Sequence, residues 1–369
     1  MSKAIEIICQ YHGTRSFGNR ENMIAQTKNV GSIYRQLNQD EIHQLIEIAC
    51  EDNERGDALL TCLACLHPGS LKPFHQQMVD HEFFRPGLIY HEADDSVSSQ
   101  FAEMIEASGD RLNRNHLLLC MAWAGNNAVQ NQFAQWRSAP PAWVNEMYVP
   151  PHSYANEAGW ELTADGSRRD LFFQTALPLI ASNQSTEADP CVGVGIPSEK
   201  TCPWCRRSLV SMLTLDLKSS LLGFFGSRGE HAETLTCDVC TAYGIVFGKL
   251  DEKGSGSWHQ KNKEPEYLPG DLDDWGAFPE RPLVLSGNSR RHFMESACWA
   301  TVPDVSFSQV GGLPTWVQDA EYPECPDCSH RMMFIGQISN EDFDRNMEGL
   351  FYMFLCDDCG STATHYQQT

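Results

Sequence analysis

The sequence predicts an α+β protein with a helical N-terminal part and a β-rich C-terminal part. Apolar residues recur at helical spacing before residue 150, proline pairs interrupt the chain near that point, and short β-branched and aromatic runs follow it. Four Cys-x-x-Cys pairs lie within the β-rich part. We therefore expect a helical domain over 1–150 and a β-rich domain over 151–369.

The helical prediction is clearest after Asn38. Asn38 can cap a helix together with Glu41, three residues later, and an apolar stripe then follows at i, i+3, i+4, i+7 and i+8. The stripe consists of Ile42, Leu45, Ile46, Ala49 and Cys50. Residues 58–65 also resemble residues 116–123, which predicts stacked helical hairpins of the HEAT type.

The boundary near residue 150 is predicted from Pro140-Pro141 and Pro150-Pro151, because paired prolines force extended backbone. Beyond them, apolar and β-branched runs alternate with turn-rich loops. The expected strands lie within 171–179, 209–217, 243–250, 281–285, 332–338 and 350–355.

Two zinc ribbons are predicted from the cysteine pairs, one over 202–240 and one over 325–359. Thiolates three residues apart on a tight turn can face one ion, and two such turns complete a tetrahedral site. The expected ligands are Cys202, Cys205, Cys237 and Cys240 in the first ribbon, and Cys325, Cys328, Cys356 and Cys359 in the second. Pairing within a ribbon closes the shorter loops at lower entropic cost, but pairing across ribbons and ordinary reduced cysteines stay open as alternatives.

Cys62 and Cys65 have the same spacing but a different context. Their neighbours are apolar and helical, without the proline, glycine or polar turn residues of a metal knuckle. We expect both to be core residues, since free cysteine packs as a small apolar side chain.

The composition excludes several classes of protein. With 27 basic and 49 acidic side chains among 369 residues, the formal net charge is −22, which repels phosphates and disfavours direct nucleic-acid binding. The first residues lack the apolar core of a signal peptide, and no run reaches the roughly 18 apolar residues of a membrane span. The expected compartment is the reducing cytoplasm, where such cysteine pairs bind metal more often than they form disulfides.

Four C-terminal segments resemble the YwqG-like domain family, and the programmed-cell-death-protein-2 family is similar there. They are Ser308-Gln-Val-Gly-Gly-Leu-Pro-Thr-Trp316, Cys325-Pro-Asp-Cys328, Met333-Phe-Ile-Gly-Gln-Ile338 and Gly349-Leu-Phe-Tyr-Met-Phe-Leu-Cys356. The resemblance implies a zinc-carrying branch with a mixed α+β fold, used for protein interaction rather than catalysis. It also implies two precedents: bacterial immunity proteins encoded beside toxins, and eukaryotic chaperones for a ribosomal protein.

Enzymatic readings fit the sequence less well. His231-Ala-Glu233 is similar to part of a zinc-deaminase signature, but the next cysteine pair begins at Cys237, too soon after it and without a preceding proline. Catalytic zinc keeps an open coordination position, whereas a four-cysteine site has none. Gly193-Val-Gly195 lacks the third glycine and the helix of a nucleotide-binding loop. We therefore expect no enzymatic activity.

An acidic segment within the loop 251–278 is the candidate partner-binding site. It contains Asp271, Asp273 and Asp274 beside Trp275 and Phe278. One interpretation is a solvated loop. The other is that the carboxylates occupy the basic substrate groove of a nuclease, with the two aromatic residues as interface anchors.

These observations lead to an expected function. The protein is expected to be a cytoplasmic immunity protein with two structural zinc ions that occludes the active or DNA-binding site of a cognate toxin, such as a secreted, type VI-like nuclease effector. The alternative is a chaperone or adaptor for a basic cellular protein such as a ribosomal protein. A zinc-dependent enzyme is the third and least favoured class. The expected partner is a protein, and neither nucleic acid nor a membrane.

Overall fold

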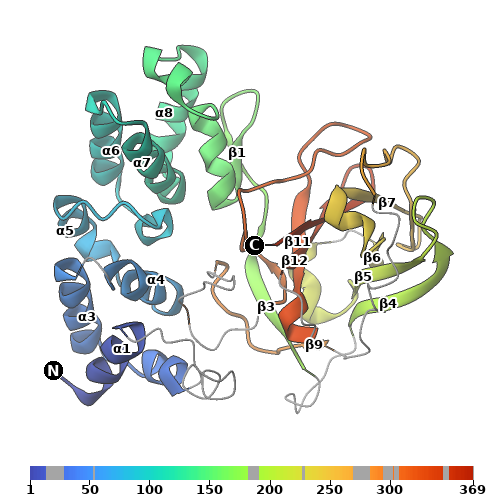
Figure 1. Cartoon of the computed structure of the whole chain (residues 1–369), viewed down its shortest axis with the longest axis horizontal. Coiled ribbons are helices and arrows are strands. Elements are labelled where there is room, and N and C mark those ends of the chain that lie inside the picture. Colours follow the sequence, from blue (N-terminus) through green and yellow to red (C-terminus); the bar gives the residue numbers. More distant parts are fainter. Residues whose placement is uncertain are drawn as a thin grey trace. The chain divides into compact units, whose positions relative to one another are not determined.

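The computed structural model describes residues 1–13, 29–52, 55–181, 191–226, 229–268, 283–293, 302, 307–343 and 349–368. The chain forms two compact units (Figure 1). Unit 1 comprises Met1–Asp170 and Met294–Val305, and unit 2 comprises Leu171–Phe293 and Ser306–Thr369. The predicted α+β class is confirmed, because unit 1 is mainly helical and unit 2 contains antiparallel sheets.

Unit 1 consists of α-helices, short 3-10 helices and one small hairpin. The α-helices are α1 (Lys3–Gly13), α3 (Gln39–Glu51), α4 (Gly56–Leu66), α5 (His75–Asp80), α6 (Asp95–Ala107), α7 (Arg111–Ala124) and α8 (Asn127–Ser138). The 3-10 helices are η1 (Lys72–Phe74), η2 (Gly87–Tyr90), η3 (Ala142–Glu146) and η4 (Pro151–Ala158), and the hairpin is β1 (Trp160–Leu162) with β2 (Arg168–Asp170). Within the described part of the chain, no helix combines the length and the hydrophobicity needed to span a bilayer.

Helix α3 begins at the predicted capping box. The Asn38 side chain accepts from the Glu41 backbone N–H at 3.0 Å, and the Glu41 carboxylate accepts from the Asn38 N–H at 3.1 Å. The five predicted stripe residues are the buried residues of this helix. Reciprocal capping satisfies two N–H groups that the first turn leaves unpaired, so the helix begins where the sequence predicts.

Unit 1 extends beyond the expected boundary near residue 150. The Trp160 side chain is fully buried and stacks on Phe133 with 5.9 Å between ring centroids. Its indole N–H donates to the carbonyl oxygen of Ala122 at 2.8 Å. A buried indole that contacts α7 and α8 attaches the β1–β2 hairpin to the helical core. The paired prolines therefore lie inside unit 1 rather than at its end.

Unit 2 contains an eight-stranded sheet, in the order β8-β7-β13-β12-β11-β10-β3-β9, and a three-stranded sheet, in the order β4-β5-β6. The strands are β3 (Phe173–Ala181), β4 (Val192–Thr201), β5 (Ser208–Asp216), β6 (His231–Thr236), β7 (Val246–Leu250), β8 (Gly256–Trp258), β9 (Leu283–Leu285), β10 (Gln309–Gly312), β11 (Met333–Ser339), β12 (Leu350–Cys356) and β13 (Ser361–Gln367). The 3-10 helices of this unit are η6 (Ser220–Phe225), η7 (Cys240–Tyr243) and η8 (Asn340–Phe343). All strand pairs are antiparallel.

Strand β12 is buried on both faces, which explains its unbroken apolar run. Phe351 and Met353 belong to a core that also contains buried residues of β5 and β11. Tyr352 and Phe354 alternate with them along the strand and pack against Trp316, with ring centroids 4.7 and 6.2 Å away. A strand covered on both faces has a continuous hydrophobic sequence instead of a polar–apolar alternation.

The segment 313–318, directly after β10, is held by one side chain from each of three successive strands, β11, β12 and β13. The bonds run from Thr315 N to Gln337 Oε1 (2.9 Å), from Val317 N to Tyr352 Oη (3.0 Å) and from Gln318 N to Gln367 Oε1 (3.0 Å). Gly312 has a φ of +71°, and a Cβ there would lie 2.7 Å from the Cβ of Ala176. Both the left-handed backbone and the close approach to β3 therefore require glycine.

Candidate metal centres

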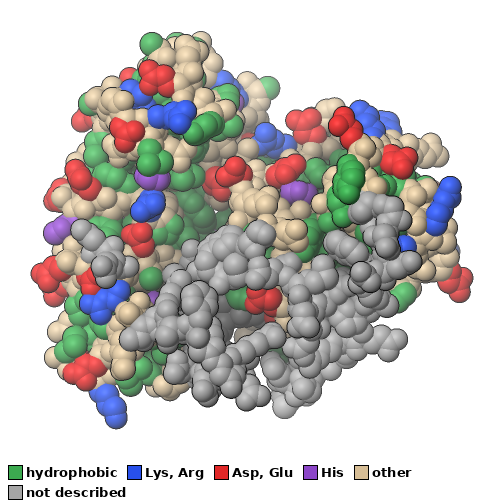
Figure 2. Space-filling model, viewed as in Figure 1, with side chains coloured by type: hydrophobic (Ala, Val, Ile, Leu, Met, Phe, Trp, Pro, Cys, Tyr) green, Lys and Arg blue, Asp and Glu red, His purple; other side chains and the backbone are tan. Residues whose placement is uncertain are grey.

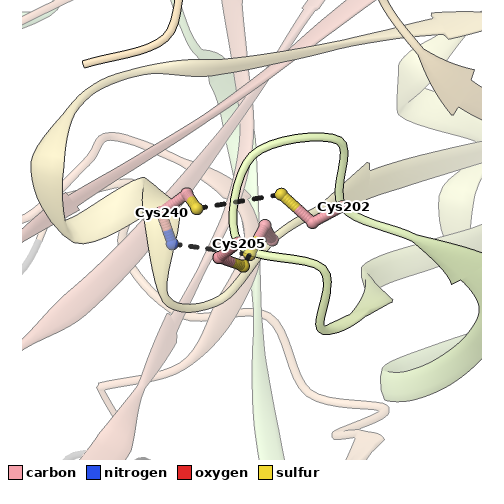
Figure 3. A group of neighbouring side chains, drawn as sticks. Cys202, Cys205 and Cys240 are labelled. Carbon is pink, nitrogen blue, oxygen red and sulfur yellow. Dashed lines mark hydrogen bonds between the residues drawn. The ribbon is translucent and has the colours of Figure 1, made fainter. Parts of the chain in front are cut away.

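Centre 1 contains the four cysteines of the first predicted ribbon. Cys202 and Cys205 lie on the turn between β4 and β5, while Cys237 and Cys240 follow β6. The four sulfur atoms all lie within 4.8 Å of one another. The Sγ atoms of Cys202 and Cys240 are 3.8 Å apart, and those of Cys205 and Cys237 are 3.4 Å apart. Figure 3 shows Cys202, Cys205 and Cys240 close to one another.

Centre 2 contains the four cysteines of the second predicted ribbon. Cys325 and Cys328 precede β11, and Cys356 and Cys359 flank the turn between β12 and β13. Their sulfur atoms also lie within 4.8 Å of one another, with 3.7 Å between the Sγ atoms of Cys328 and Cys356. Each ribbon therefore forms its own cluster, and the alternative of pairing across ribbons is excluded.

The first turn of each centre has the same backbone hydrogen bonds. They run from Cys202 N to Arg207 O (2.7 Å), from Arg206 N to Cys202 O (3.0 Å), from Cys325 N to His330 O (2.8 Å) and from Ser329 N to Cys325 O (2.8 Å). The residue after the second cysteine is left-handed in both turns, with φ +67° at Arg206 and +63° at Ser329. The repeated geometry brings both sulfur atoms of a pair to one side of the turn, as a shared metal ion requires.

The sulfur positions fit a tetrahedral four-thiolate site. A metal–sulfur distance of about 2.3 Å places the corners of a tetrahedron about 3.8 Å apart, close to the observed Sγ–Sγ distances of 3.4, 3.7 and 3.8 Å. A disulfide would require about 2.05 Å, and all eight residues are free cysteines. Four soft thiolates in this arrangement suit zinc or iron rather than a hard cation such as magnesium.

Hydrogen bonding within the clusters already favours thiolate at one position of each. In centre 1, hydrogen bonds from Cys237 and Cys240 lower the pKa of Cys202, while the contacts with Cys202 raise the pKa of Cys237 and Cys240. In centre 2, burial raises the pKa of Cys325, but hydrogen bonds from the backbone N–H groups of Cys328 and Asp327 and from the side chains of Cys356 and Ser361 together lower it to about 7. Donors directed at sulfur stabilise its charged form, which is the form that binds metal.

Asp327 lies between the two cysteines of the first pair in centre 2, and four donors surround its carboxylate. Its carboxylate lies 2.7 Å from Lys249 Nζ, 3.0 Å from Lys261 Nζ, 3.2 Å from His259 Nε2 and 2.9 Å from Ser361 Oγ. Lys249 is the strongest of several partners that hold the pKa of this carboxyl well below its usual range. This cluster was not predicted from the sequence, where its local signal is an acidic residue inside a cysteine pair.

Cys62 and Cys65 belong to neither centre. Both are buried in α4, and the Cys62 sulfur lies 3.9 Å from Nε2 of His12. Over the described ranges, the two four-cysteine sets are the groups of His, Cys, Asp and Glu whose ligand atoms are close enough to share an ion.

The His231-Ala-Glu233 segment has a structural explanation. It lies on β6, where Glu233 accepts hydrogen bonds from the Ser211 hydroxyl and, at 2.7 Å, from the Gly256 N–H. These bonds join β5, β6 and β8. The exposed His231 lies 3.8 Å from the Asp216 carboxylate.

The candidate partner-binding residues Asp271, Asp273, Asp274, Trp275 and Phe278 lie outside the described residues. Glu264 and Glu266, at the described start of the same acidic segment, are exposed.

The fold and the two centres define an α+β protein with paired four-cysteine knuckles. No family model matches the chain, and no solved structure matches it. The chain is 33% identical over 346 residues to a protein of Salmonella typhimurium (strain LT2) named uncharacterized protein YpfL, and the match covers 91% of this chain and 79% of that protein. The chain therefore belongs to the YpfL family.

Proposed function

We propose that each centre binds one zinc ion in a structural role. The observation that carries this proposal is the completeness of both cysteine sets, since four sulfur ligands close a tetrahedral site and leave no position for a reacting water. A bound ion would cross-link two turns in each ribbon. Catalytic zinc chemistry would need a fourth position free of protein ligands, so we propose that the protein is not an enzyme.

We further propose that the protein is a cytoplasmic immunity protein of the YwqG-like type, with HEAT-like helical hairpins in unit 1. It would bind a cognate toxin, such as a type VI-like nuclease effector, and occlude its active or DNA-binding site. Closed metal centres support binding over catalysis, and a net charge of −22 favours a cationic protein partner over nucleic acid.

The distribution of charge supports long-range attraction rather than one preformed acidic site. On the face drawn in Figure 2, acidic side chains are scattered among basic ones over the residues that are coloured. A diffuse excess of negative charge accelerates encounter with a cationic protein, and salt screens it beyond a Debye length of roughly 8 Å at physiological ionic strength. The contact itself would require a local anchor, for which we propose the segment around Trp275 and Phe278.

The second candidate function is a chaperone or adaptor for a basic cellular protein such as a ribosomal protein. The same net charge supports it, because a strongly acidic surface also shields a cationic client from nucleic acid. The two functions differ in the partner, which is a toxin in one case and a housekeeping protein in the other.

Co-expression with the product of the neighbouring reading frame tests the immunity function. The wild-type chain should restore growth of cells that express this product and should co-purify with it. A variant with Asp271, Asp273 and Asp274 all changed to Lys should bind more slowly and protect less, because charge reversal removes the attraction to a basic groove.

The matched control reverses three exposed acidic residues on the helices of unit 1, Glu47, Asp80 and Glu103. Equal loss of protection in both triple variants would show that only net charge matters and would remove the acidic segment from the interface. No protection by the wild-type chain, together with capture of a basic housekeeping protein, would favour the chaperone function instead.

A further inference from the structure

We propose that residues 246–261, here called the hairpin arm, couple the two metal centres so that they load and lose metal cooperatively. The arm contains β7, β8 and the three residues after β8. This inference rests on the proposed zinc binding and goes beyond it, because two structural ions need not influence each other.

One side of the arm contacts centre 1. The ring of Trp258, the last residue of β8, lies edge-on to Trp204 with 4.8 Å between centroids. Trp204 lies inside the first cysteine pair, between Cys202 and Cys205. Both tryptophans pack against the buried apolar cluster around the cysteines of centre 1. The position of Trp258 therefore depends on the conformation of the turn that holds Cys202 and Cys205.

The adjacent residue of the arm contacts centre 2. The His259 side chain is 5% exposed, and its Nε2 lies 3.2 Å from the carboxylate of Asp327, between Cys325 and Cys328 of centre 2. Its Nδ1 accepts the Lys261 N–H at 3.1 Å, so Nε2 carries the proton that is donated to Asp327. Lys249, on β7, adds bonds of 2.7 Å to Asp327 and to the carbonyl oxygen of Cys359.

The arm between these contacts is firmly held. The His259 N–H donates to the carbonyl oxygen of Phe247 at 3.1 Å, and the Asn262 side chain makes two bonds of 2.8 Å to the backbone of Phe247. β7 also pairs with β13, where Lys249 lies opposite Ser361. Trp258 and His259, which are adjacent in the chain, thus contact the cysteine turns of different centres. Disorder in the turn of one centre therefore disturbs the contacts of the other centre.

The consequence is thermodynamic and reciprocal. Metal in centre 1 fixes Trp204 and the arm, which places His259 and Lys249 against Asp327 and preorganises centre 2. Metal in centre 2 must favour centre 1 by the same factor. Coupling between sites typically changes affinity by about 5–150-fold, and we expect a change of about fivefold or more here.

The test uses the intact protein loaded with zinc. It is titrated with a chelator, and native mass spectrometry counts the chains that carry zero, one and two ions. The affinity of each centre alone is measured in Cys205→Ser and Cys328→Ser, and these two values give the one-zinc population expected for independent centres. Cooperative loading predicts fewer one-zinc chains at half occupancy than this value. A one-zinc population at or above the value for independent centres would overturn the coupling while leaving zinc binding intact. A protein that binds no zinc would refute the zinc proposal and this inference with it.

Two variants locate the coupling. Trp258→Leu keeps an apolar side chain but loses the edge contact to Trp204, so one-zinc chains should rise to the value for independent centres. Lys253→Ala, at an exposed position on the turn of the arm, should keep the wild-type distribution. An unchanged distribution in Trp258→Leu would overturn the assignment to the arm. The wild-type titration decides whether coupling exists even where this variant folds poorly.

Discussion

The indole N–H of Trp160 donates to the backbone carbonyl oxygen of Ala122, 2.8 Å away, across a fully buried contact. This bond places the β1–β2 hairpin in unit 1. We expect a fragment of residues 1–170 to unfold cooperatively on heating, whereas a fragment of residues 1–150 loses the hairpin and exposes the site that Trp160 fills. Circular dichroism checks this. Equally cooperative unfolding of both fragments would contradict the role of the hairpin.

The Tyr352 hydroxyl is the next test, because it holds the segment after β10. It donates to Thr315 O at 2.8 Å and accepts from Val317 N at 3.0 Å in the core. Tyr352→Phe should lower the free energy of unfolding by about 1–3 kcal/mol, since it leaves a buried N–H and a buried carbonyl without their partner. Urea denaturation measures this difference.

The matched control is Tyr267→Phe in the same unit, where the tyrosine is 67% exposed. Removing an exposed hydroxyl should change the free energy of unfolding by less than about 0.5 kcal/mol. Equal effects of the two substitutions would show that the Tyr352 hydroxyl does not hold the segment.

The sequence was sufficient to locate both cysteine clusters because each ligand pair is a local turn. The positions of Cys202 and Cys205 along the chain already determine their relative placement. The same holds for the stripe of α3 and for the apolar run of β12, whose patterns reflect their own burial. Local periodicity and spacing therefore predicted the elements and the candidate metal ligands.

What the sequence could not predict depends on contacts between distant residues. Asp327 meets Lys249 and Ser361 only because β7 pairs with β13, and nothing in the local pattern specifies that pairing. The boundary of unit 1 was misplaced for the same reason, since the contact of Trp160 with Ala122 overrides the proline signal. Proline restricts the local backbone, but burial of a large aromatic residue decides which unit a hairpin joins.

The pH dependence of stability should contain a contribution from His75. Burial lowers the pKa of this imidazole from 6.5 to about 4, and its Nε2–H donates to Ile89 O at 3.0 Å. Between these two values the unfolded chain binds a proton that the folded chain does not, so stability falls as pH decreases from 6.5 to 4. The contribution is about 3 kcal/mol at most.

The measurement compares urea denaturation at pH 7 and pH 5. His75→Gln removes the titrating group, so it should lose less stability between these pH values than the wild type. His81→Gln, at an exposed position one residue after α5, controls for the removal of one imidazole. A wild-type pH dependence in His75→Gln would contradict the assignment.

Cysteines of the metal centres and cysteines of the helical core should respond differently to substitution by serine. Cys328→Ser removes a proposed zinc ligand, and structural zinc contributes on the order of 10–16 kcal/mol to folding in small zinc peptides. Cys62→Ser places a hydroxyl in the core of α4 and should cost about 1–3 kcal/mol. Melting temperatures of the two variants measure the difference. A larger loss in Cys62→Ser would mean that centre 2 does not bind a structural ion.

The zinc content of the purified chain shows whether both centres bind an ion. Native mass spectrometry of protein purified without chelator should give a mass with two zinc ions per chain, because each four-cysteine set completes one tetrahedral site. Cys205→Ser and Cys328→Ser should each leave at most one. A folded wild-type chain that carries zero or one zinc ion would contradict the two-centre account.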